Sequence, residues 1–173
     1  MTVMGSVSED LADQEIEHTV MDCDPDLADT AQFCAAYGIP MENSANAILV
    51  ASRKPEGLYA LCLVLATTRL DVNGVVRRRL GARKVSFASA DDTLETIGQA
   101  IGGVTVFGVP DDLPIWVDSH VLDRDWVIVG AGTRTAKIKV DPAIFAERAR
   151  FEVVEGLAKP IEPSGEGASE NAG

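Results

Sequence analysis

The stretch "NAILVASRKPEGLYALCLVLAT", residues 46–67, decides the expected fold. It contains two apolar runs, residues 46–52 and 57–67, separated by "RKPEG". Short apolar runs on either side of a segment with proline and glycine are typical of two strands joined as a hairpin. We therefore expect a pair of buried strands at the centre of the protein.

Segments that favour helices and strands follow this hairpin in turn. Asp71 is expected to cap a helix over residues 71–81, and Ser89 a second helix that ends at Gly98. Upstream, a helix is expected from Asp26 to Gly38. Further strands are predicted at residues 15–22, 83–89, 113–119, 125–132, 135–141 and 150–156, and a short helix at residues 142–149.

This pattern gives about seven strands and four or five helices, with several strands joined by hairpins. It favours an α+β fold with a mixed sheet over a doubly wound parallel sheet. A chain of 173 residues suggests one domain. We expect that domain to span residues 13–157, between a flexible acidic N-terminus (1–12) and a disordered acidic tail (158–173) rich in Pro, Gly, Ser and Glu.

The composition excludes several classes of protein. No apolar run approaches the roughly 20 residues that span a bilayer, and the N-terminus lacks a basic region followed by an apolar one, so no secretory signal is expected. Cys23, Cys34 and Cys62 are scattered and show no metal-ligand spacing with His18 or His120. We expect a cytoplasmic protein without a membrane partner, a metal or another cofactor.

The net charge of −12 is concentrated at the two ends of the chain. Residues 1–31 contain nine acids and no lysine or arginine, whereas residues 32–150 contain 13 acids and 14 lysines and arginines. The densest basic cluster is "RRRLGARK", residues 77–84. It is either an ordinary solvated face or a surface that attracts phosphate.

A second distinctive stretch is "TIGQAIGGVTVFGVP", residues 96–110, which has four glycines. It matches neither GxGxxG nor a phosphate-binding P-loop, and it leads into a strand and not into a helix. Either it is a tight turn, or it is a loop whose backbone N–H groups approach a ligand, with Thr105 as the polar side chain. No histidine lies beside a candidate nucleophile, which argues against covalent catalysis.

Four blocks together carry a resemblance to a known family. They are "DTAQFCAAYGIPMENSANAILVA", "ATTRLDVNGVVRRRLGARKVSFAS", "TIGQAIGGVTVFGVPDDLPIWVD" and "VIVGAGTRTAKIKV". In order and spacing they resemble the YbaK / prolyl-tRNA synthetase-associated editing domains, which deacylate mischarged tRNA. The resemblance covers roughly residues 15–155 and implies a curved mixed sheet flanked by helices.

The resemblance also implies a site. The family lysine that faces the 3′-terminal aminoacyl-adenosine corresponds to Asn46, and the family loop proline corresponds to Val106, so the chain departs from the pattern twice. The family's glycine loop maps onto residues 102–106, followed by Gly108. A family aspartate maps onto Asp118, and a glycine-rich turn onto Gly130 and Gly132.

By this resemblance the chain is expected to be a stand-alone aminoacyl-tRNA deacylase that uses backbone donors of the glycine loop and no covalent nucleophile. The catalytic candidates are Asn46, Thr105, Gly102 and Gly103. The substrate-binding candidates are Val104, Val106, Gly108, Asp118 and Gly130. The candidates for contact with tRNA are Arg77, Arg78 and Lys84.

The expected partners are the aminoacylated 3′ end of tRNA and an aminoacyl-tRNA synthetase. Two alternatives remain open at this point. In the first, the chain binds tRNA or an aminoacyl-nucleotide without hydrolysis, because Asn46 lacks the charge of the family lysine. In the second, the acidic N-terminus binds another protein.

Overall fold

The structure is a computed structural model that describes residues 2–161. The helical elements are α1 (Val3–Asp13), η1 (Pro25–Leu27), α2 (Thr30–Tyr37), η2 (Met41–Asn43), η3 (Val72–Val76), α3 (Arg77–Leu80), α4 (Ala90–Ile97), η4 (Ser119–Asp123) and α5 (Ile144–Glu147). The strands are β1 (His18–Asp22), β2 (Ala45–Lys54), β3 (Glu56–Leu65), β4 (Thr68–Leu70), β5 (Lys84–Phe87), β6 (Ile115–Asp118), β7 (Val127–Gly130), β8 (Ala136–Val140), β9 (Glu152–Val154) and β10 (Ala158–Pro160).

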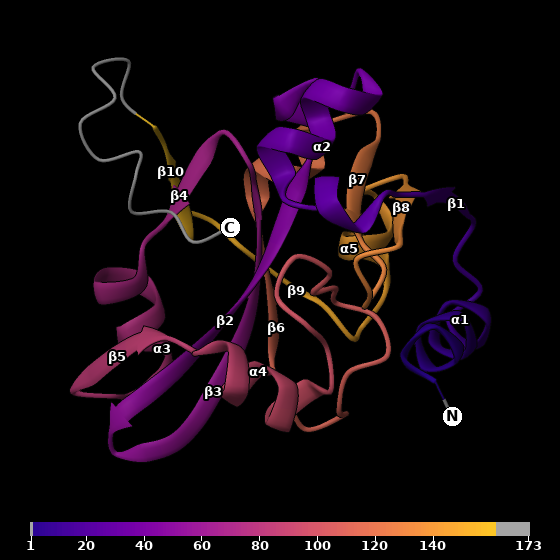
Figure 1. Ribbon diagram of the computed structural model, residues 1–173. Helices are drawn as coiled ribbons and strands as arrows, with labels where there is room; N and C mark the ends of the chain where they lie inside the picture. Colours follow the sequence, from indigo (N-terminus) through magenta and orange to yellow (C-terminus); the bar gives the residue numbers. More distant parts are fainter. Residues whose placement is uncertain (1, 162–173) are drawn as a thin grey trace.

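The expected hairpin is confirmed at the centre of the largest sheet. Strands β2 and β3 pair antiparallel, with Asn46 opposite Val64. The sheet has the order β5-β2-β3-β6-β9, in which β3 pairs parallel with β6 and β6 with β9. Figure 1 shows the three-stranded sheet of β1, β8 and β7 on the opposite side of the molecule from β5 and α3.

Strand β3 is buried on both faces, which explains its unbroken apolar sequence. Leu61, Leu63 and Leu65 belong to the core cluster that also contains residues of β6, β7, β8 and α1. The alternate residues Cys62 and Val64 face a second cluster under η3 and β5. A strand with two apolar faces needs cover on both sides, so other elements must pack against each face of the sheet.

The α+β class is confirmed, but the expectation of one sheet with about seven strands is wrong. The described residues form ten strands in sheets of five, three and two. The sequence reveals which runs can be strands, but not which strands pair. The two-stranded sheet joins β4 and β10, each three residues long, and runs this short give no clear alternation.

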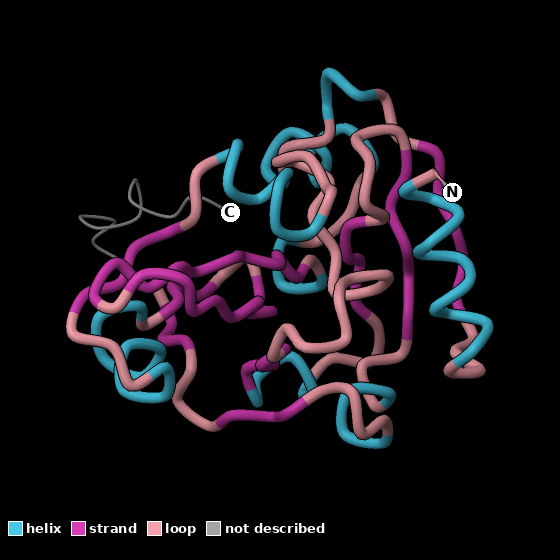
Figure 2. The backbone as a smooth tube through the Cα atoms, turned by 90° about the horizontal axis from the view of Figure 1, so that it is seen from below, coloured by secondary structure: helices cyan, strands magenta, loops and turns pink. Residues whose placement is uncertain are grey.

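The first residues were expected to be flexible, and the structure corrects this expectation. They form α1, in which the Thr2 side chain accepts a hydrogen bond from Gly5 N at 3.0 Å. Val7 and Leu11, four residues apart on one helix face, are buried in the main core. Figures 1 and 2 show α1 at the edge of the molecule, beside β1.

The tail was expected to be disordered from residue 158, and its start is also corrected. Ala158–Pro160 is β10 and pairs antiparallel with β4, because Ala158 is buried and its N–H donates to the buried carboxylate of Asp118. The rest of the expected tail, residues 162–173, lies outside the described residues.

Two helices differ from expectation in detail. The expected helix from Asp26 to Gly38 is divided into η1 and α2, and Asp29 stands at the N-cap of α2. The expected helix over residues 71–81 begins as the π-helical turn η3 and continues as α3. The Asp71 carboxylate accepts from both Gly74 N and Val75 N, so the predicted cap is confirmed.

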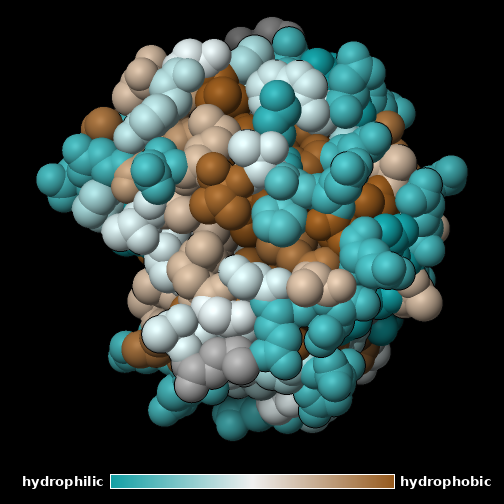
Figure 3. Space-filling view, turned by 90° about the vertical axis from the view of Figure 1, so that its right-hand side faces the viewer, coloured by the Kyte–Doolittle hydropathy of each residue, from teal (hydrophilic) through white to brown (hydrophobic). Residues whose placement is uncertain are grey.

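The face that carries α1 and β1 is mixed in polarity. In Figure 3 hydrophobic residues lie in the middle of this face, with hydrophilic residues across and around them. No helix within residues 2–161 is both long enough and apolar enough to cross a bilayer.

Candidate functional site

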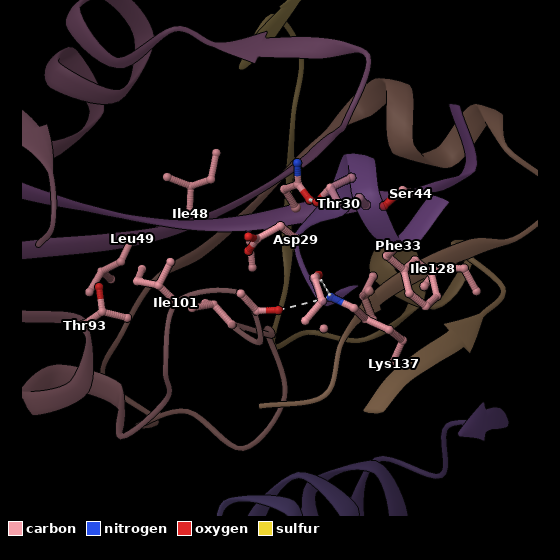
Figure 4. Close-up of a pocket in the computed structure, with 18 of the residues that line it drawn as sticks. Asp29, Thr30, Phe33, Ser44, Ile48, Leu49, Thr93, Ile101, Ile128 and Lys137 are labelled. Atoms are coloured by element: carbon pink, nitrogen blue, oxygen red, sulfur yellow. Dashed lines mark hydrogen bonds between the residues drawn. The ribbon is translucent and has the colours of Figure 1, made fainter. Parts of the chain in front are cut away.

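A pocket of about 80 Å³ lies where the start of β2, the N-terminus of α2, the glycine loop and strands β7 and β8 meet (Figure 4). A volume of this size holds several water molecules or a small acyl group. Its lining residues are Ala28, Asp29, Thr30, Phe33, Ser44, Ala45, Asn46, Ala47, Ile48, Leu49, Phe87, Ala88, Thr93, Ile101, Gly102, Val104, Ile128, Val129, Gly130 and Lys137.

The wall from β2 carries a polar pair. The Thr30 hydroxyl, at the start of α2, donates a hydrogen bond of 2.7 Å to Oδ1 of Asn46. This bond fixes the orientation of the Asn46 amide and leaves its Nδ2 group without a partner among the described residues. A primary amide carries two donors on that nitrogen, so the pair presents N–H groups that a ligand oxygen can accept.

Three N–H groups of the glycine loop are already used within the protein. Gly103 N donates to Ala100 O at 3.0 Å, Thr105 N to the Gln99 side chain at 2.8 Å, and Gly108 N to Asp10 at 2.8 Å. In the described part of the chain, the N–H groups of Gly102 and Val104 have no hydrogen-bond partner. Both residues line the pocket, so the loop offers two backbone donors there.

The glycines of this loop allow the backbone to approach the β7–β8 turn closely. A Cβ at Gly103 would lie 2.9 Å from Cα of Thr133, and a Cβ at Gly130 would lie 2.8 Å from Gly103 O. Real Cβ atoms essentially never come within 3.0 Å of such atoms. Gly132 N also donates to Gly103 O at 2.6 Å. The loop and the turn are therefore packed backbone against backbone.

Two basic residues tie the loop to the segment before α2. Arg134 donates to Pro25 O at 3.0 Å and to Ile101 O at 3.3 Å, and it pairs with Asp29 at 3.1 Å. Beneath it, Lys137 Nζ donates to Ala28 O at 2.7 Å and to Gly102 O at 3.1 Å. Dashed lines in Figure 4 mark these two hydrogen bonds from the Lys137 nitrogen.

Lys137 is a buried cation without a carboxylate partner among the described residues. Its side chain is only 7% exposed, and its Nζ lies 5.4 Å from the centre of the Phe33 ring. Burial is the main cause that lowers the pKa of this ammonium below 10.5, and the charge of Arg134 lowers the pKa further. A lysine whose pKa is lowered by burial in a pocket is a feature that functional sites often show.

The lowered pKa of Lys137 gives a prediction for stability. Between its folded pKa and the ordinary value of 10.5, the unfolded chain binds more protons than the folded protein at this residue. The contribution of Lys137 to the free energy of unfolding should therefore rise with pH across that window. Denaturant titrations at several alkaline pH values should show that Lys137→Met lacks this rise. An identical pH profile in both proteins would contradict the prediction.

The structure separates the residues that the sequence predicted for the site. The pocket lining includes Asn46, Gly102, Val104 and Gly130, and it does not include Gly103, Thr105, Val106, Gly108 or Asp118. Val106 is fully buried in the main core. Gly108 lies against the backbone of α1, since a Cβ added at Gly108 would lie 2.9 Å from Val7 N. Gly103 supports the loop from behind.

Thr105 and Asp118 occupy structural positions away from the lining. Both are fully buried. The Thr105 hydroxyl has no hydrogen-bond partner among the described residues. Asp118 caps η4 through His120 N at 3.3 Å and accepts from Ala158 N at 3.0 Å, so its carboxylate holds β10 in place.

Sequence reasoning missed Lys137, Thr30 and Arg134. Lys137 lies in the alternating strand sequence "AKIKV", where a lysine is expected to face solvent. Thr30 lies at a helix start, where a capping role is the ordinary interpretation. One signal in the sequence could have pointed to Lys137. Asn46 stands where the family has a lysine, and a pocket that lacks this lysine can obtain its positive charge from another basic residue.

The candidates for contact with tRNA lie away from the pocket. Arg77 and Arg78 are on α3, and Lys84 begins β5. Lys84 is the cross-strand partner of Lys54 at the far end of β2 from Asn46, and neither lysine forms an ion pair with a described residue. Like charges opposite one another weaken a strand pair, so this edge of the sheet carries unneutralised positive charge.

Comparison with known proteins places these observations in a family. The model of the aminoacyl-tRNA editing domain matches residues 24–147, and the chain belongs to that family. The predicted resemblance is therefore confirmed. All the residues that line the pocket fall within the matched range.

Individual relatives are more distant. An uncharacterized protein, YwhH of Bacillus subtilis (strain 168), is 25% identical over 131 residues, which are 76% of this chain and 81% of that protein. The crystal structure of hypothetical protein APE2540 superposes with a TM-score of 0.78 at 20% identity, covering 89% of this chain and 99% of that one. The crystal structure of a candidate trans-editing enzyme for prolyl-tRNA synthetase superposes with a TM-score of 0.73 at 21% identity, covering 90% of this chain and 96% of that one. At these identities the two structures show a shared fold.

Proposed function

We propose that the chain is a stand-alone aminoacyl-tRNA deacylase that hydrolyses the ester of a mischarged tRNA. The observation that carries this proposal is the pocket itself, which combines unpartnered N–H donors with apolar walls inside an editing-domain fold. An aminoacyl ester is already reactive toward water. The enzyme therefore needs to position the ester and a water molecule, and it does not need a protein nucleophile.

The lining residues divide into two roles in this proposal. Side chains of Ile48, Ile101 and Val104 form the apolar surface against which the amino acid lies. The Asn46 amide and the N–H groups of Gly102 and Val104 donate to oxygens of the ester and the terminal ribose. A preorganised donor aimed at a developing oxyanion contributes a factor of about 10² to 10³ in rate in well-studied enzymes.

Thr105 and Gly103 take supporting positions in this scheme, because neither lines the pocket. Gly103 holds the loop against the β7–β8 turn through the bond from Gly132 N to its carbonyl. Thr105 N is held by Gln99, whose side chain also donates to Phe107 O at 3.2 Å. The loop is therefore held in one conformation by neighbours on both sides, as preorganised donors require.

The direct test is hydrolysis of a panel of tRNAs, each charged with a cognate or a noncognate amino acid. The purified chain should release at least one noncognate amino acid faster than buffer alone, and the cognate amino acid more slowly. A known editing domain assayed in parallel controls for the quality of the substrates. If every tRNA in the panel keeps its amino acid as long as it does in buffer, the hydrolytic proposal fails.

Replacement of Asn46 tests the polar pair on β2. In Asn46→Ala the Thr30 hydroxyl loses its acceptor and the pocket loses an N–H donor. Loss of a donor to the reacting ester costs about 1–3 kcal/mol of transition-state stabilisation, so kcat/KM should fall by a factor of about 5 to 150. The exposed Asn73→Ala provides the matched control and should retain the activity of the unaltered protein. Equal activity in both variants would remove Asn46 from the site.

A second candidate function is binding of aminoacylated tRNA or an aminoacyl-nucleotide without hydrolysis. Asn46, which stands where the resemblance places a lysine, favours this alternative. Measurable affinity for tRNA without turnover, unchanged by Asn46→Ala, would support it. A gain of hydrolysis in Asn46→Lys would show that the missing charge alone separates the two functions.

The surroundings of the site complete the proposal. Arg77, Arg78 and Lys84 are proposed to attract tRNA phosphates, a contact that should weaken as salt concentration rises. Hydrolysis of mischarged tRNA would make the protein a hydrolase that maintains the fidelity of translation. It would act in the cytoplasm together with an aminoacyl-tRNA synthetase. Association with a synthetase is testable by co-purification of the full chain with tagged synthetases.

A further inference from the structure

The pocket contains one feature that the proposed function above does not use, the ammonium group of Lys137. This group belongs to the pocket lining, and it comes from β8. Its neighbour across the strand pair is Gly130, which has no side chain and also lines the pocket. The lysine side chain therefore reaches the pocket from β8, whereas Asn46 reaches it from β2.

The hydrogen bonds of Lys137 leave one donor for a ligand. An ammonium has three N–H groups, and two of them are used by Ala28 O at 2.7 Å and Gly102 O at 3.1 Å. The third has no acceptor among the described residues. In Figure 4 the nitrogen lies among the labelled residues of the pocket, with Asp29 and Ile101 on its left and Phe33 and Ile128 on its right.

The charge of this ammonium is not neutralised by a carboxylate partner. The group is buried, the carboxylate of Asp29 pairs with Arg134 at 3.1 Å, and the Phe33 ring at 5.4 Å attracts the ammonium without carrying a negative charge. A buried charge without a charged partner destabilises a folded protein. Its presence in a pocket indicates that it interacts with a negative or strongly polar group of the ligand.

We propose that Lys137 is a catalytic residue whose third N–H group binds the acyl carbonyl oxygen of the ester. The proposal rests on the proposed function for the identity of the ester. In the reaction, water adds to the carbonyl carbon and negative charge accumulates on the oxygen that Lys137 contacts. The bond from carbon to the ribose oxygen then breaks, and that oxygen takes the proton that the water loses. Lys137 keeps its own proton throughout.

The same side chain joins two segments that line the pocket. Ala28 belongs to the segment before α2 and Gly102 to the glycine loop, and Lys137 bonds a carbonyl of each. Gly102 also supplies one of the two unpartnered backbone N–H groups that belong to pocket-lining residues of the loop. Since Lys137 bonds the carbonyl of this same residue, we expect its third donor and the Gly102 N–H group to bind one oxygen together.

The test compares binding of two adenosine analogues by titration calorimetry. The first is 3′-alanylamino-3′-deoxyadenosine, in which an amide that resists hydrolysis replaces the ester. The second is 3′-amino-3′-deoxyadenosine, which lacks the acyl group. For the unaltered protein the acylated analogue should bind more tightly. In Lys137→Met this preference should disappear, while affinity for the analogue without an acyl group should change by less than a factor of about 3.

Lys139→Met is the matched control. Lys139 lies two residues further along β8, is exposed and stacks on Trp126 with its Nζ 4.5 Å from the ring centre. This variant should retain the preference for the acylated analogue. If Lys137→Met weakens both analogues equally, the lysine only holds the walls together and the proposal is overturned. It is also overturned if the preference survives in Lys137→Met, or if the unaltered protein binds neither analogue.

Single-turnover deacylation separates this proposal from the proposed function. On a tRNA that the unaltered protein hydrolyses, Lys137→Met should lower the rate by a factor of about 10² or more, as loss of an oxyanion donor does. If the unaltered protein hydrolyses no tRNA but shows the analogue preference that depends on Lys137, the deacylase proposal fails and the carbonyl contact stands. If hydrolysis proceeds and Lys137→Met matches the unaltered rate, the lysine proposal fails alone.

Discussion

Gly130→Ala should lower the free energy of unfolding by about 3 kcal/mol. The added methyl group would lie 2.8 Å from Gly103 O and closer still to Val104 O, and both are backbone atoms that no side-chain rotation can move. Relief of the clash would require the glycine loop to separate from β7. For a chain of this length the midpoint of thermal unfolding should fall by roughly 6–12 °C, measured by circular dichroism.

Gly81→Ala separates this clash from the loss of glycine as such. Gly81 ends α3 in the left-handed region with φ +67°, and a Cβ there would meet no atom within 4 Å. Gly81→Ala should therefore lower the free energy of unfolding only by the strain of the left-handed conformation, about 1 kcal/mol. The two variants should therefore differ by about 2 kcal/mol. If they unfold at the same temperature, the close approach at Gly130 is not the constraint that the structure describes.

Deletion of residues 1–13 should destabilise the protein at least as strongly as Gly130→Ala. Val7 and Leu11 are 0% and 1% exposed, and complete burial of two such side chains contributes about 3–6 kcal/mol. The deletion also removes the Asp10 carboxylate that accepts from Gly108 N at 2.8 Å. Since a domain is stable by only about 5–15 kcal/mol, urea titration should show a much lower midpoint or an unfolded chain.

The control for the deletion keeps the helix and removes surface charge. Glu9→Gln with Asp13→Asn alters two exposed acids of α1 and should leave the urea midpoint unchanged within error. Leu11→Ala in the intact chain should cost about 2–5 kcal/mol. A deletion protein as stable as the full chain would restore the view of this segment as a free acidic arm that contacts a partner.

The fold was predictable where burial and local hydrogen bonds decide it. The apolar runs of β2 and β3 could only be interior strands, and Ser89 and Gly98 bound α4 as expected, with Ser89 accepting from Asp92 N at 3.0 Å. The first helix was missed because nine acids in residues 1–31 suggested a solvated segment. Its two buried residues, Val7 and Leu11, are too few to dominate that composition.

Site residues could be predicted where they lie in a segment that matches the family pattern. They could not be predicted where the site forms by the packing of several distant segments. Asn46, Gly102 and Val104 were found because they lie in matched blocks. Lys137 was missed because alternation along β8 predicts that Lys137 and Lys139 share a solvent-facing side. They do share a face, but the loops before α2 and after α4 cover only Lys137. The sequence of a strand does not indicate whether loops from distant parts of the chain will cover one of its residues.

The glycine loop shows the same limit in another form. Its glycines suggested N–H groups that point at a ligand, and three of those groups are bonded within the protein. The glycines at 102, 103 and 130 leave space for Arg134, Thr133 and Val104. Sequence alone identifies a position where a side chain is absent, and only the packed structure shows what occupies the space.

The contacts of α1 have a consequence for the order of folding. Asp10 bonds Gly108, and the residues that follow the helix are held by Arg148, which donates to Gln14 O at 2.8 Å and to Glu15 O at 3.1 Å. These pairs are separated by 98 to 134 residues. Because Gly108 and Arg148 are synthesised long after α1, the helix and the residues that follow it cannot complete these contacts until residue 148 has been made. Such nonlocal contacts slow folding, and α1 is expected to close the structure last.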